Sequence, residues 1–487
     1  MNPLWALVPP LAVIPFILLL GEKRKNWREV SILVAGVALF LINKSIYNDL
    51  MAGGTPQSGE IGLLADYTLK LSAEPMGVMF GLLASFLWVV TTVYSIGYMR
   101  GHHEINQTRF YTCFAIALAA VMGAAYADNL LTLFVAYEVI TISTFPLVTH
   151  AGGVDAKKAG RVYLGILMTT SIGFLLPAIV WTATVGSSLD FVPGGVLSDP
   201  GLSNGAMACL LGLFVFGIAK AGIMPFHRWL PAAMVAPTPV SALLHAVAVV
   251  KTGVFSLLKI VTYTFGIDTV VGSGAAQWFL PVAAFTVIVS SIVAITKDNL
   301  KARLAYSTIS QLSYIVMAAL LATVMSVSGG VLHIVMHAFG KITLFFCAGA
   351  ILVALHKSEI SKLDGIGRRM PITMGAFFVG AVSIIGLPPA GGVWSKLLIA
   401  GGSLDTGTII WASVLMLSTL LNIAYLLPIP LRAFFKPDPS LAPGEKATLQ
   451  EAPPACLWAI VLTAFTCLLL FVYPQPLTEL IGLIQWR

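Results

Sequence analysis

Apolar segments of about 20 residues recur from one end of this chain to the other. A helix of that length crosses the roughly 30 Å hydrocarbon core of a membrane, because it rises about 1.5 Å per residue. The composition excludes a soluble domain, since 58% of the 487 residues are hydrophobic and only 10% are charged. We therefore predict an all-α polytopic membrane protein. About fourteen transmembrane helices are expected, near residues 4–20, 29–48, 74–98, 111–127, 129–149, 161–185, 206–236, 239–263, 277–295, 303–322, 328–355, 371–402, 408–433 and 454–473.

The basic residues predict how these helices are oriented. Of the 28 lysines and arginines, 20 lie in alternate connections, beginning with residues 21–28. The opposite set of connections and the C-terminus hold only Lys70 and Arg487. Because positively charged connections stay in the cytoplasm, we expect both termini outside, in a multi-pass protein of the cell inner (plasma) membrane. The basic residues do not gather in one patch, so nucleic acid is not an expected partner.

Two of the long apolar segments contain helix-breaking residues near their centres. In the segment 206–236, Pro225 should break the helix at mid-membrane, because proline lacks a backbone donor and clashes with the preceding turn. In the segment 371–402, Gly386–Gly392 includes two adjacent prolines and should have the same effect. Irregular backbone at this depth is tolerated only where protein or a wet cavity covers it.

Ionisable side chains lie deep inside the apolar segments, next to these breaks. A charged side chain at the bilayer centre costs from about 3 to about 10 kcal/mol, so it must face a polar interior, a partner or a water-filled path. We infer a path for protons. The candidates are Glu138, Lys220, Lys251 and Lys396 as the principal relay, with His245, His333, His337 and Lys341 as secondary groups.

The two broken helices occupy corresponding positions, which predicts a pair of inverted five-helix repeats. Helices 4–8, within residues 111–263, would form the first repeat, and helices 9–13, within residues 277–433, the second. Helices 7 and 12 would be the discontinuous members, and each repeat would contain a proton half-channel. Residues 1–110 would supply the first three helices, and residues 434–487 a loop and the last helix.

Each candidate also has a purely structural interpretation. Glu138 and a neighbouring lysine would form an ion pair that only holds two helices together. A buried lysine such as Lys341 would bond to carbonyls freed by a neighbouring kink. Lys44 and Lys259 lie near the outer ends of their spans, where a long side chain reaches the membrane surface. For these two lysines we expect such snorkelling instead of a role in the path.

The first repeat would receive the proton and hold it. We expect Glu138 to pair with Lys220, so that the proton stays on the lysine until the pair opens. Lys251 would then accept the proton through water or through a serine or histidine. His245 would feed the path from the cytoplasmic side, because imidazole titrates near neutral pH.

The second repeat would carry the proton out. His333, His337 and Lys341 follow one another at four-residue intervals and therefore share one helix face. We expect them to pass the charge toward Lys396. That lysine lies beyond the second helix break and would be the exit group.

Several sequence motifs surround these residues. They are Tyr137-Glu138, the stretch from Lys220 to Pro231, the stretch from Pro237 to His245 followed by Lys251, the stretch from Lys301 to Gln311, the pair His333 and His337, and Gly386-Leu387-Pro388-Pro389 followed by Lys396. Together they resemble the antiporter-like proton-channel subunits shared by respiratory complex I, membrane-bound hydrogenases and the Mrp cation/proton antiporters. The resemblance covers essentially the whole chain. It implies that the matching glutamate and the lysines of helices 7, 8 and 12 form a proton relay along the membrane midplane.

The chain is most similar within this family to the D-type subunits of the Mrp antiporters, because a lysine stands at position 396 and no lateral amphipathic extension is present. We expect a subunit of a hetero-oligomeric secondary antiporter that couples proton entry to the export of a monovalent cation, in particular sodium. It would not be an enzyme and would bind neither cofactor nor metal. The five cysteines form no C-x-x-C pair, so any redox chemistry would belong to a partner chain.

Two other functions stay open. The first is a proton-pumping membrane subunit of a redox-driven complex I-like or hydrogenase complex. The second is a structural scaffold beside another subunit that carries out transport. Electron-transfer groups in the purified assembly would indicate the first, and exchange that survives the loss of Glu138 or Lys220 would indicate the second.

Overall fold

The computed structural model describes residues 1–64, 67–197, 201–439 and 447–486. The first half contains the strands β1 (Ile61–Leu64) and β2 (Tyr67–Leu69) and the helices α1 (Val8–Leu20), α2 (Lys25–Met51), α3 (Pro75–Gly101), α4 (Gln107–Ala125), α5 (Leu130–Val148), α6 (Gly153–Thr170), α7 (Leu176–Val185), α8 (Asn204–Gly217), α9 (Trp229–Ala232), α10 (Thr238–Ala242) and α11 (Val249–Ile260). The second half contains α12 (Ile267–Gly272), α13 (Leu280–Thr296), α14 (Leu300–Leu321), α15 (Val324–Leu355), α16 (Pro371–Ile385), α17 (Gly392–Asp405), α18 (Ile409–Leu426), α19 (Pro428–Phe435), α20 (Pro454–Val472) and α21 (Gln475–Gly482).

Among the described residues, 12 helical segments are long and apolar enough to cross a membrane. Two shorter apolar helices, α8 and α16, begin the two interrupted spans. Every predicted span overlaps one of these segments, so the all-α polytopic membrane fold is confirmed. Some spans consist of two consecutive helices, such as α10 and α11, which are joined by a π-helical turn over Leu243–Val247.

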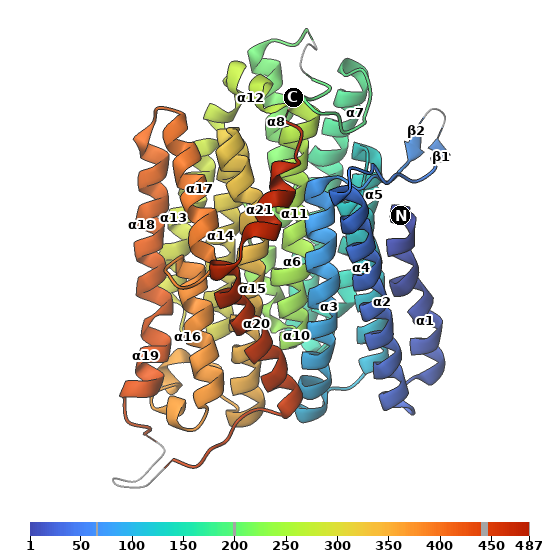
Figure 1. Cartoon of the computed structure of the whole chain (residues 1–487). Coiled ribbons are helices and arrows are strands. Elements are labelled where there is room, and N and C mark those ends of the chain that lie inside the picture. Colours follow the sequence, from blue (N-terminus) through green and yellow to red (C-terminus); the bar gives the residue numbers. More distant parts are fainter. Residues whose placement is uncertain (65–66, 198–200, 440–446, 487) are drawn as a thin grey trace.

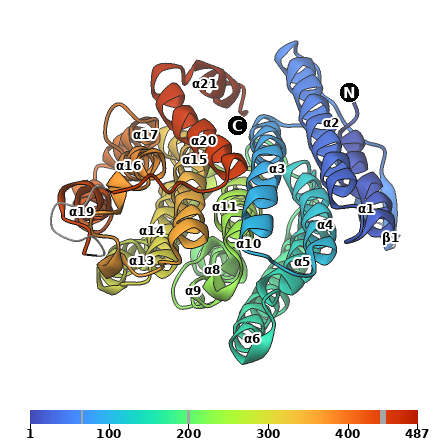
Figure 2. The ribbon, with the colours of Figure 1, turned by 90° about the horizontal axis from the view of Figure 1, so that it is seen from below.

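The helices stand side by side, with the β1–β2 hairpin at one end of the bundle and α19 at the other (Figure 1). Seen from below, α1 and α2 form one edge of the bundle, α19 lies at the opposite edge, and α10, α11 and α15 lie between them (Figure 2). The apolar stretch of Thr238–Phe265 is 100% buried, whereas that of Lys25–Met51 is 33% buried. The α10–α11 span is therefore shielded from lipid.

The first interrupted span breaks earlier than the sequence predicted. α8 ends at Gly217, and residues 218–228 form irregular turns before α9 begins. Pro225 lies inside this segment, but the helix has already ended well before it. The indole nitrogen of Trp229 donates to the carbonyl of Ala219 at 2.9 Å. Because a side chain satisfies a carbonyl that the broken helix has freed, the chain can leave the helix before the proline.

The second interrupted span breaks where the sequence predicted. α16 ends at Ile385, Gly386 has a φ of 82°, and α17 begins at Gly392. A Cβ atom on Gly392 would lie 1.9 Å from the carbonyl oxygen of Ser383, so only glycine lets the two halves of the span pack this closely. α8 starts from the hairpin end of the bundle and α16 from the opposite end (Figure 1). The two broken spans run in opposite directions, as an inverted repeat requires.

The connection over residues 49–73 includes regular secondary structure. It contains the hairpin of β1 and β2, in which Ile61 pairs with Leu69 and Gly62 with Thr68. The side-chain amide of Asn129 donates to the carbonyl of Thr68 at 2.8 Å, and Asn129 also caps α5. The hairpin is thereby tied to the beginning of a transmembrane helix.

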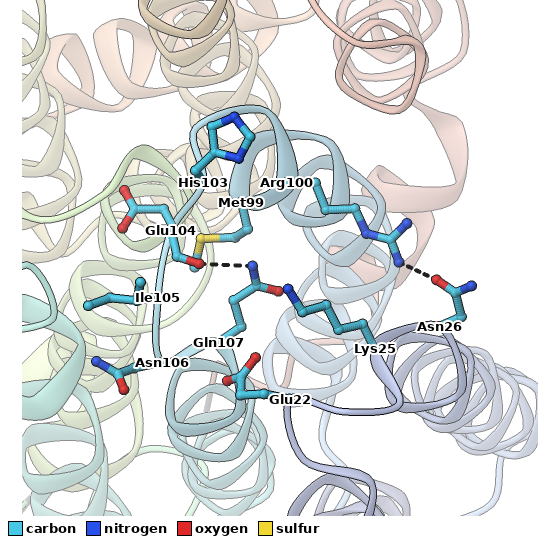
Figure 3. Close-up of a pocket in the computed structure, with 10 residues that line it drawn as sticks. All are labelled: Glu22, Lys25, Asn26, Met99, Arg100, His103, Glu104, Ile105, Asn106 and Gln107. Carbon is cyan, nitrogen blue, oxygen red and sulfur yellow. Dashed lines mark hydrogen bonds between the residues drawn. The ribbon is translucent and has the colours of Figure 1, made fainter.

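At the other end of the bundle, a pocket of about 570 Å³ lies where α2, α3 and α4 meet (Figure 3). On its rim, the Arg100 guanidinium donates to the side chain of Asn26 at 2.6 Å. Arg28, which is fully buried next to it, donates to the side chains of Gln107 at 2.9 Å and of Thr108 at 3.0 Å. These contacts join α2 to α4 through one buried charge.

Replacing Arg28 by methionine should destabilise this end of the bundle. The change leaves several buried oxygen acceptors without a donor, and losing one partner of a buried charge network costs about 3–5 kcal/mol. Thermal unfolding of the purified protein in detergent measures the loss. Lys25→Met is the matched control, because Lys25 lines the same pocket but is exposed. Equal stability of the two variants would contradict a structural role for Arg28.

Candidate proton path in the membrane interior

The ionisable side chains that the sequence singled out lie in the interior of the bundle. Fully or almost fully buried are Lys220, Lys251, Lys341, His245, His333 and His337. Lys44, by contrast, is exposed beside the ring of Tyr47, as expected for a snorkelling lysine. Because an unpaired charge is costly in an apolar interior, the partners of each buried group decide what it can do.

Lys220 lies in the irregular segment after α8 and reaches α5. Its Nζ donates to the carbonyl of Tyr137 at 2.7 Å and to the hydroxyl of Thr141 at 2.6 Å. The same ammonium lies 3.0 Å from the centre of the Tyr137 ring. The predicted ion pair with Glu138 is not formed, and both carboxylate oxygens of Glu138 are buried without a hydrogen-bond partner among the described residues. The tertiary structure instead gives the ammonium a carbonyl and a hydroxyl one helical turn apart.

The backbone at Lys220 lies directly against α11. A Cβ atom on Gly253 would lie 2.5 Å from the carbonyl carbon of Lys220 and from the backbone nitrogen of Ala221. Only glycine permits this approach. Gly253 follows Lys251 by two residues, so the close contact brings the first helix break beside the part of α11 that carries the next lysine.

Lys251 is linked to two histidines of α15. Its Nζ lies 2.5 Å from Nδ1 of His337. The ring of His337 lies 5.8 Å from that of His333. Nδ1 of His333 is in turn 2.8 Å from the hydroxyl of Ser395, on α17. The structure therefore brings together three candidates that the sequence placed on two different helices.

Lys396 lies at the end of this row of side chains. Its Nζ donates to the carbonyl of Ile385, the last residue of α16, at 2.9 Å. It also lies 4.8 Å from the centre of the Tyr314 ring, which stacks on His333 at 5.8 Å. The second helix break thus supplies both the lysine and the carbonyl that binds it.

Lys341 does not lie between the histidines and Lys396, contrary to the expected order. Its Nζ donates to the hydroxyl of Ser307 at 2.5 Å. The same hydroxyl lies 2.8 Å from the hydroxyl of Tyr425, which donates to the side-chain oxygen of Asn422 at 2.5 Å. Lys341 therefore belongs to a branch that runs between α14 and α18. The three residues share one face of α15, but the neighbouring helices direct them to different partners.

His245 occupies the π-helical turn between α10 and α11. Its ring lies 4.7 Å from that of Phe345, and neither ring nitrogen has a hydrogen-bond partner among the described residues. Since the side chain is fully buried, it does not contact the cytoplasm directly. A role as a proton feeder would require water to reach these nitrogens.

Lys259 contradicts the prediction of snorkelling. Its side chain is only 1% exposed, its Nζ donates to the carbonyl of Ala127 at 2.6 Å, and Oε1 of Glu74 lies 3.3 Å away. The sequence did offer a signal, because Lys251 and Lys259 are eight residues apart and therefore on one face of a helix. Glu74 directly precedes the first residue of α3, and nothing in the sequence indicated that it is the partner of Lys259.

The partners of these groups are all uncharged side chains, carbonyls or rings, apart from the carboxylate of Glu74. Among the described residues, no group of three or more histidine, cysteine, aspartate or glutamate side chains could hold a metal ion. Nitrogen and hydroxyl groups within hydrogen-bond reach of one another can instead pass protons. That is the chemistry this arrangement supports best.

Comparison with known proteins agrees with this geometry. The profile of the family described as NADH:quinone oxidoreductase/Mrp antiporter, TM, matches residues 127–422. NADH-quinone oxidoreductase subunit N of Desulforudis audaxviator is 29% identical over 465 residues, which are 95% of this chain and 92% of that protein. Hydrogenase-4 component B of Escherichia coli is 30% identical over 349 residues, and this chain covers 50% of its length.

Two solved structures have the same fold. A chain of the membrane-bound sulfane sulfur reductase, an archaeal respiratory membrane complex, aligns with a TM-score of 0.86 and 21% identity over 99% of this chain and 96% of its own length. A chain of the Mrp complex from Dietzia sp. DQ12-45-1b aligns with a TM-score of 0.84 and 20% identity over the same shares. With the matched profile covering more than half of its length, this chain belongs to the NADH:quinone oxidoreductase/Mrp antiporter family of membrane proteins.

Proposed function

We propose that this chain is the proton-translocating subunit of a multi-subunit antiporter that exchanges protons for a monovalent cation, in particular sodium. Its role would correspond to that of the D-type subunits of Mrp antiporters, in a cell membrane and with both termini outside. The observation that carries the proposal is the row of buried groups from Lys251 through His337 and His333 to Lys396. The fold shared with the Dietzia Mrp chain supports it.

In this mechanism a proton moves between nitrogens of neighbouring side chains. The Lys251 ammonium gives a proton to Nδ1 of neutral His337, 2.5 Å away. His337 then releases a proton from Nε2, which has no partner among the described residues and would need a water molecule to receive it. His333 and the hydroxyl of Ser395 would pass it on toward Lys396, the proposed exit. Glu138 and Lys220 would determine the charge at the side where the proton enters the row.

The two proposed half-channels lie in residues 111–263 and 277–433. The first holds Glu138, Lys220, His245 and Lys251, and the second holds His333, His337, Lys341 and Lys396. The contact between Lys251 and His337 would be the junction of the two halves. A proton path across the membrane would thus depend on one contact between helices of different repeats.

A second candidate function is a proton-pumping subunit of a redox-driven complex. It is favoured by the match to NADH-quinone oxidoreductase subunit N over 95% of this chain. The same row of lysines and histidines would then move protons in response to electron transfer in other subunits. The partner chains, and not this chain, decide between the two functions.

The assembly purified with this chain tests the proposal. We expect its absorption spectrum to lack flavin and iron–sulfur bands, and we expect a sodium gradient across proteoliposomes to drive proton movement, read with a pH-sensitive dye. Potassium and choline gradients are the controls for cation selectivity and for leak. Flavin or iron–sulfur absorbance together with no sodium-driven proton movement would overturn the antiporter and support the redox pump.

A further inference from the structure

A second polar region lies at the hairpin end of the bundle, away from the row that ends at Lys396. A cavity of about 370 Å³ is lined there by Glu74, Asp128, Lys259 and Tyr263, among other residues. Residues before α3, between α4 and α5 and at the end of the α10–α11 span all contribute to its wall. The cavity therefore lies where three transmembrane segments of the first half of the chain meet.

Lys259 forms the inner wall of this cavity and is held on several sides. Its Nζ donates to the carbonyl of Ala127, lies 3.3 Å from Oε1 of Glu74, and lies 4.7 Å from the centre of the Phe191 ring. Only 1% of its side chain is exposed, although it lines the cavity.

Glu74 is oriented by the beginning of α3. Its two carboxylate oxygens accept from the backbone nitrogens of Met76 and Gly77, each at 2.9 Å, and the hydroxyl of Tyr263 donates to Oε2 at 3.2 Å. The positive end of the α3 helix dipole also favours the charged carboxylate. Glu74 is therefore positioned both to bind the Lys259 ammonium and to face the water of the cavity.

A small internal cavity lies between α5 and the α10–α11 span, and it is lined by neighbours of both Lys259 and Lys220. Ser256 lies one helical turn before Lys259 and lines a cavity of about 10 Å³ together with Tyr137. Tyr137 is the residue whose carbonyl accepts from the Lys220 ammonium. A cavity of about 10–15 Å³ is large enough for one water molecule, and Tyr137 and Ser256 are the two lining residues that carry hydroxyl groups.

We propose that Lys259 and Glu74 form a proton port between the Lys220 site and the aqueous phase on the hairpin side of the membrane. The inference rests on the proposed function, because it presumes that Lys220 handles protons. It adds a second opening, in the first repeat, to the exit proposed at Lys396. The N–H bond of protonated Lys259 breaks as an O–H bond forms on Oε1 of Glu74, and Glu74 then gives the proton to water in the cavity. The neutral amine is protonated again from the interior.

The ionisable residues around the cavity are consistent with proton transfer there. Burial raises the pKa of the Asp128 carboxyl, although Lys259 and Lys70 oppose the rise, so Asp128 is a further group that can accept a proton there. Burial alone would lower the pKa of Lys70, but the hydrogen bond and charge of Asp190, 2.8 Å away, outweigh it and raise the pKa. Lys70 thus stays charged.

The variant Lys259→Arg distinguishes a residue that carries protons from one that only holds two segments together. An arginine keeps the positive charge and the ion pair with Glu74, but it does not release its proton in a protein. We expect Lys259→Arg to lower the exchange rate of the intact complex in membrane vesicles about tenfold or more, with the amount of assembled complex unchanged. Lys44→Arg is the matched control, because Lys44 is exposed near the same end of its span. Wild-type exchange in Lys259→Arg would overturn the port.

A labelling experiment keeps the inference testable if the arginine variant does not assemble. Ser72 lines the cavity, so Ser72→Cys, made in a Cys209→Ser background because Cys209 is exposed, places a thiol in the proposed port. A membrane-impermeant cationic thiol reagent should block exchange when it reaches the hairpin face, and not the opposite face, of right-side-out and inverted vesicles. Modification without inhibition, or no modification from either side, would overturn the port.

The failure of this inference can be told apart from failure of the proposed function. If Lys220→Ala abolishes exchange while Lys259→Arg leaves it intact, the proton path exists but does not use this port. If Lys220→Ala also leaves exchange intact, the proposed function itself is wrong. Measuring both variants in the same vesicles separates the two outcomes.

Discussion

Replacing Lys220 by alanine should lower cation-driven proton exchange about 100-fold or more. The change removes the ammonium that contacts the carbonyl of Tyr137 and the hydroxyl of Thr141, and with it the proposed proton-transfer group of the first helix break. Dye-reported exchange in vesicles that contain equal amounts of assembled complex measures the effect.

Two further variants are needed to interpret the result for Lys220→Ala. Lys220→Arg keeps the charge but not the ability to release a proton, so it should be nearly as inactive as Lys220→Ala. Lys44→Ala removes an exposed lysine and should exchange at the wild-type rate. Full activity in Lys220→Ala would contradict a proton path through this chain and would support the scaffold, in which another subunit carries out transport.

Breaking the contact between Lys251 and His337 should have an effect of similar size. This hydrogen-bond contact joins the row of groups on α15 and α17 to α11, with 2.5 Å between the two nitrogens. Lys251→Ala and His337→Leu should each lower exchange about 100-fold, since each removes a proton-transfer group. Because both residues act in one step, the double variant should be no slower than the slower single variant. Initial rates of dye-reported proton movement in vesicles check this expectation.

The control for Lys251 is Lys362→Ala, because Lys362 is 65% exposed in a surface ion pair with Glu359. Surface pairs contribute little, so this variant should behave as wild type. Losses that multiply in the double variant would show that Lys251 and His337 act separately. The proposed junction between the two repeats would then be wrong.

Much of the fold could be predicted because lipid constrains a membrane protein strongly. A span needs about 20 apolar residues, and backbone groups in the hydrocarbon core must bond within a helix. The spans and the second helix break at Gly386 follow from this rule. The first break was predicted at Pro225 but begins after Gly217, because packing and the Trp229 bond, which are not local in sequence, decide where the helix ends.

The sequence did not predict which groups the buried lysines contact. Opposite charge suggested that Glu138 would pair with Lys220, yet the ammonium bonds to Tyr137 and Thr141. Position near the end of a span suggested that Lys259 would reach the membrane surface, yet the segments packed around α11 enclose it beside Glu74. In both cases a distant segment supplies the partner, and the spacing of residues along one helix carries no information about it.

The sequence by itself therefore determined that this chain crosses a membrane many times and where its spans lie. It also determined which ionisable side chains lie within the spans and must have polar partners there. The tertiary structure alone decided which of those side chains meet, because the hydrophobic pattern specifies how long each helix is but not which neighbour faces it. Hydrogen bonds a few ångströms long link Lys251 to His337 and Lys220 to Thr141 across helices that are about 80 or more residues apart in the chain.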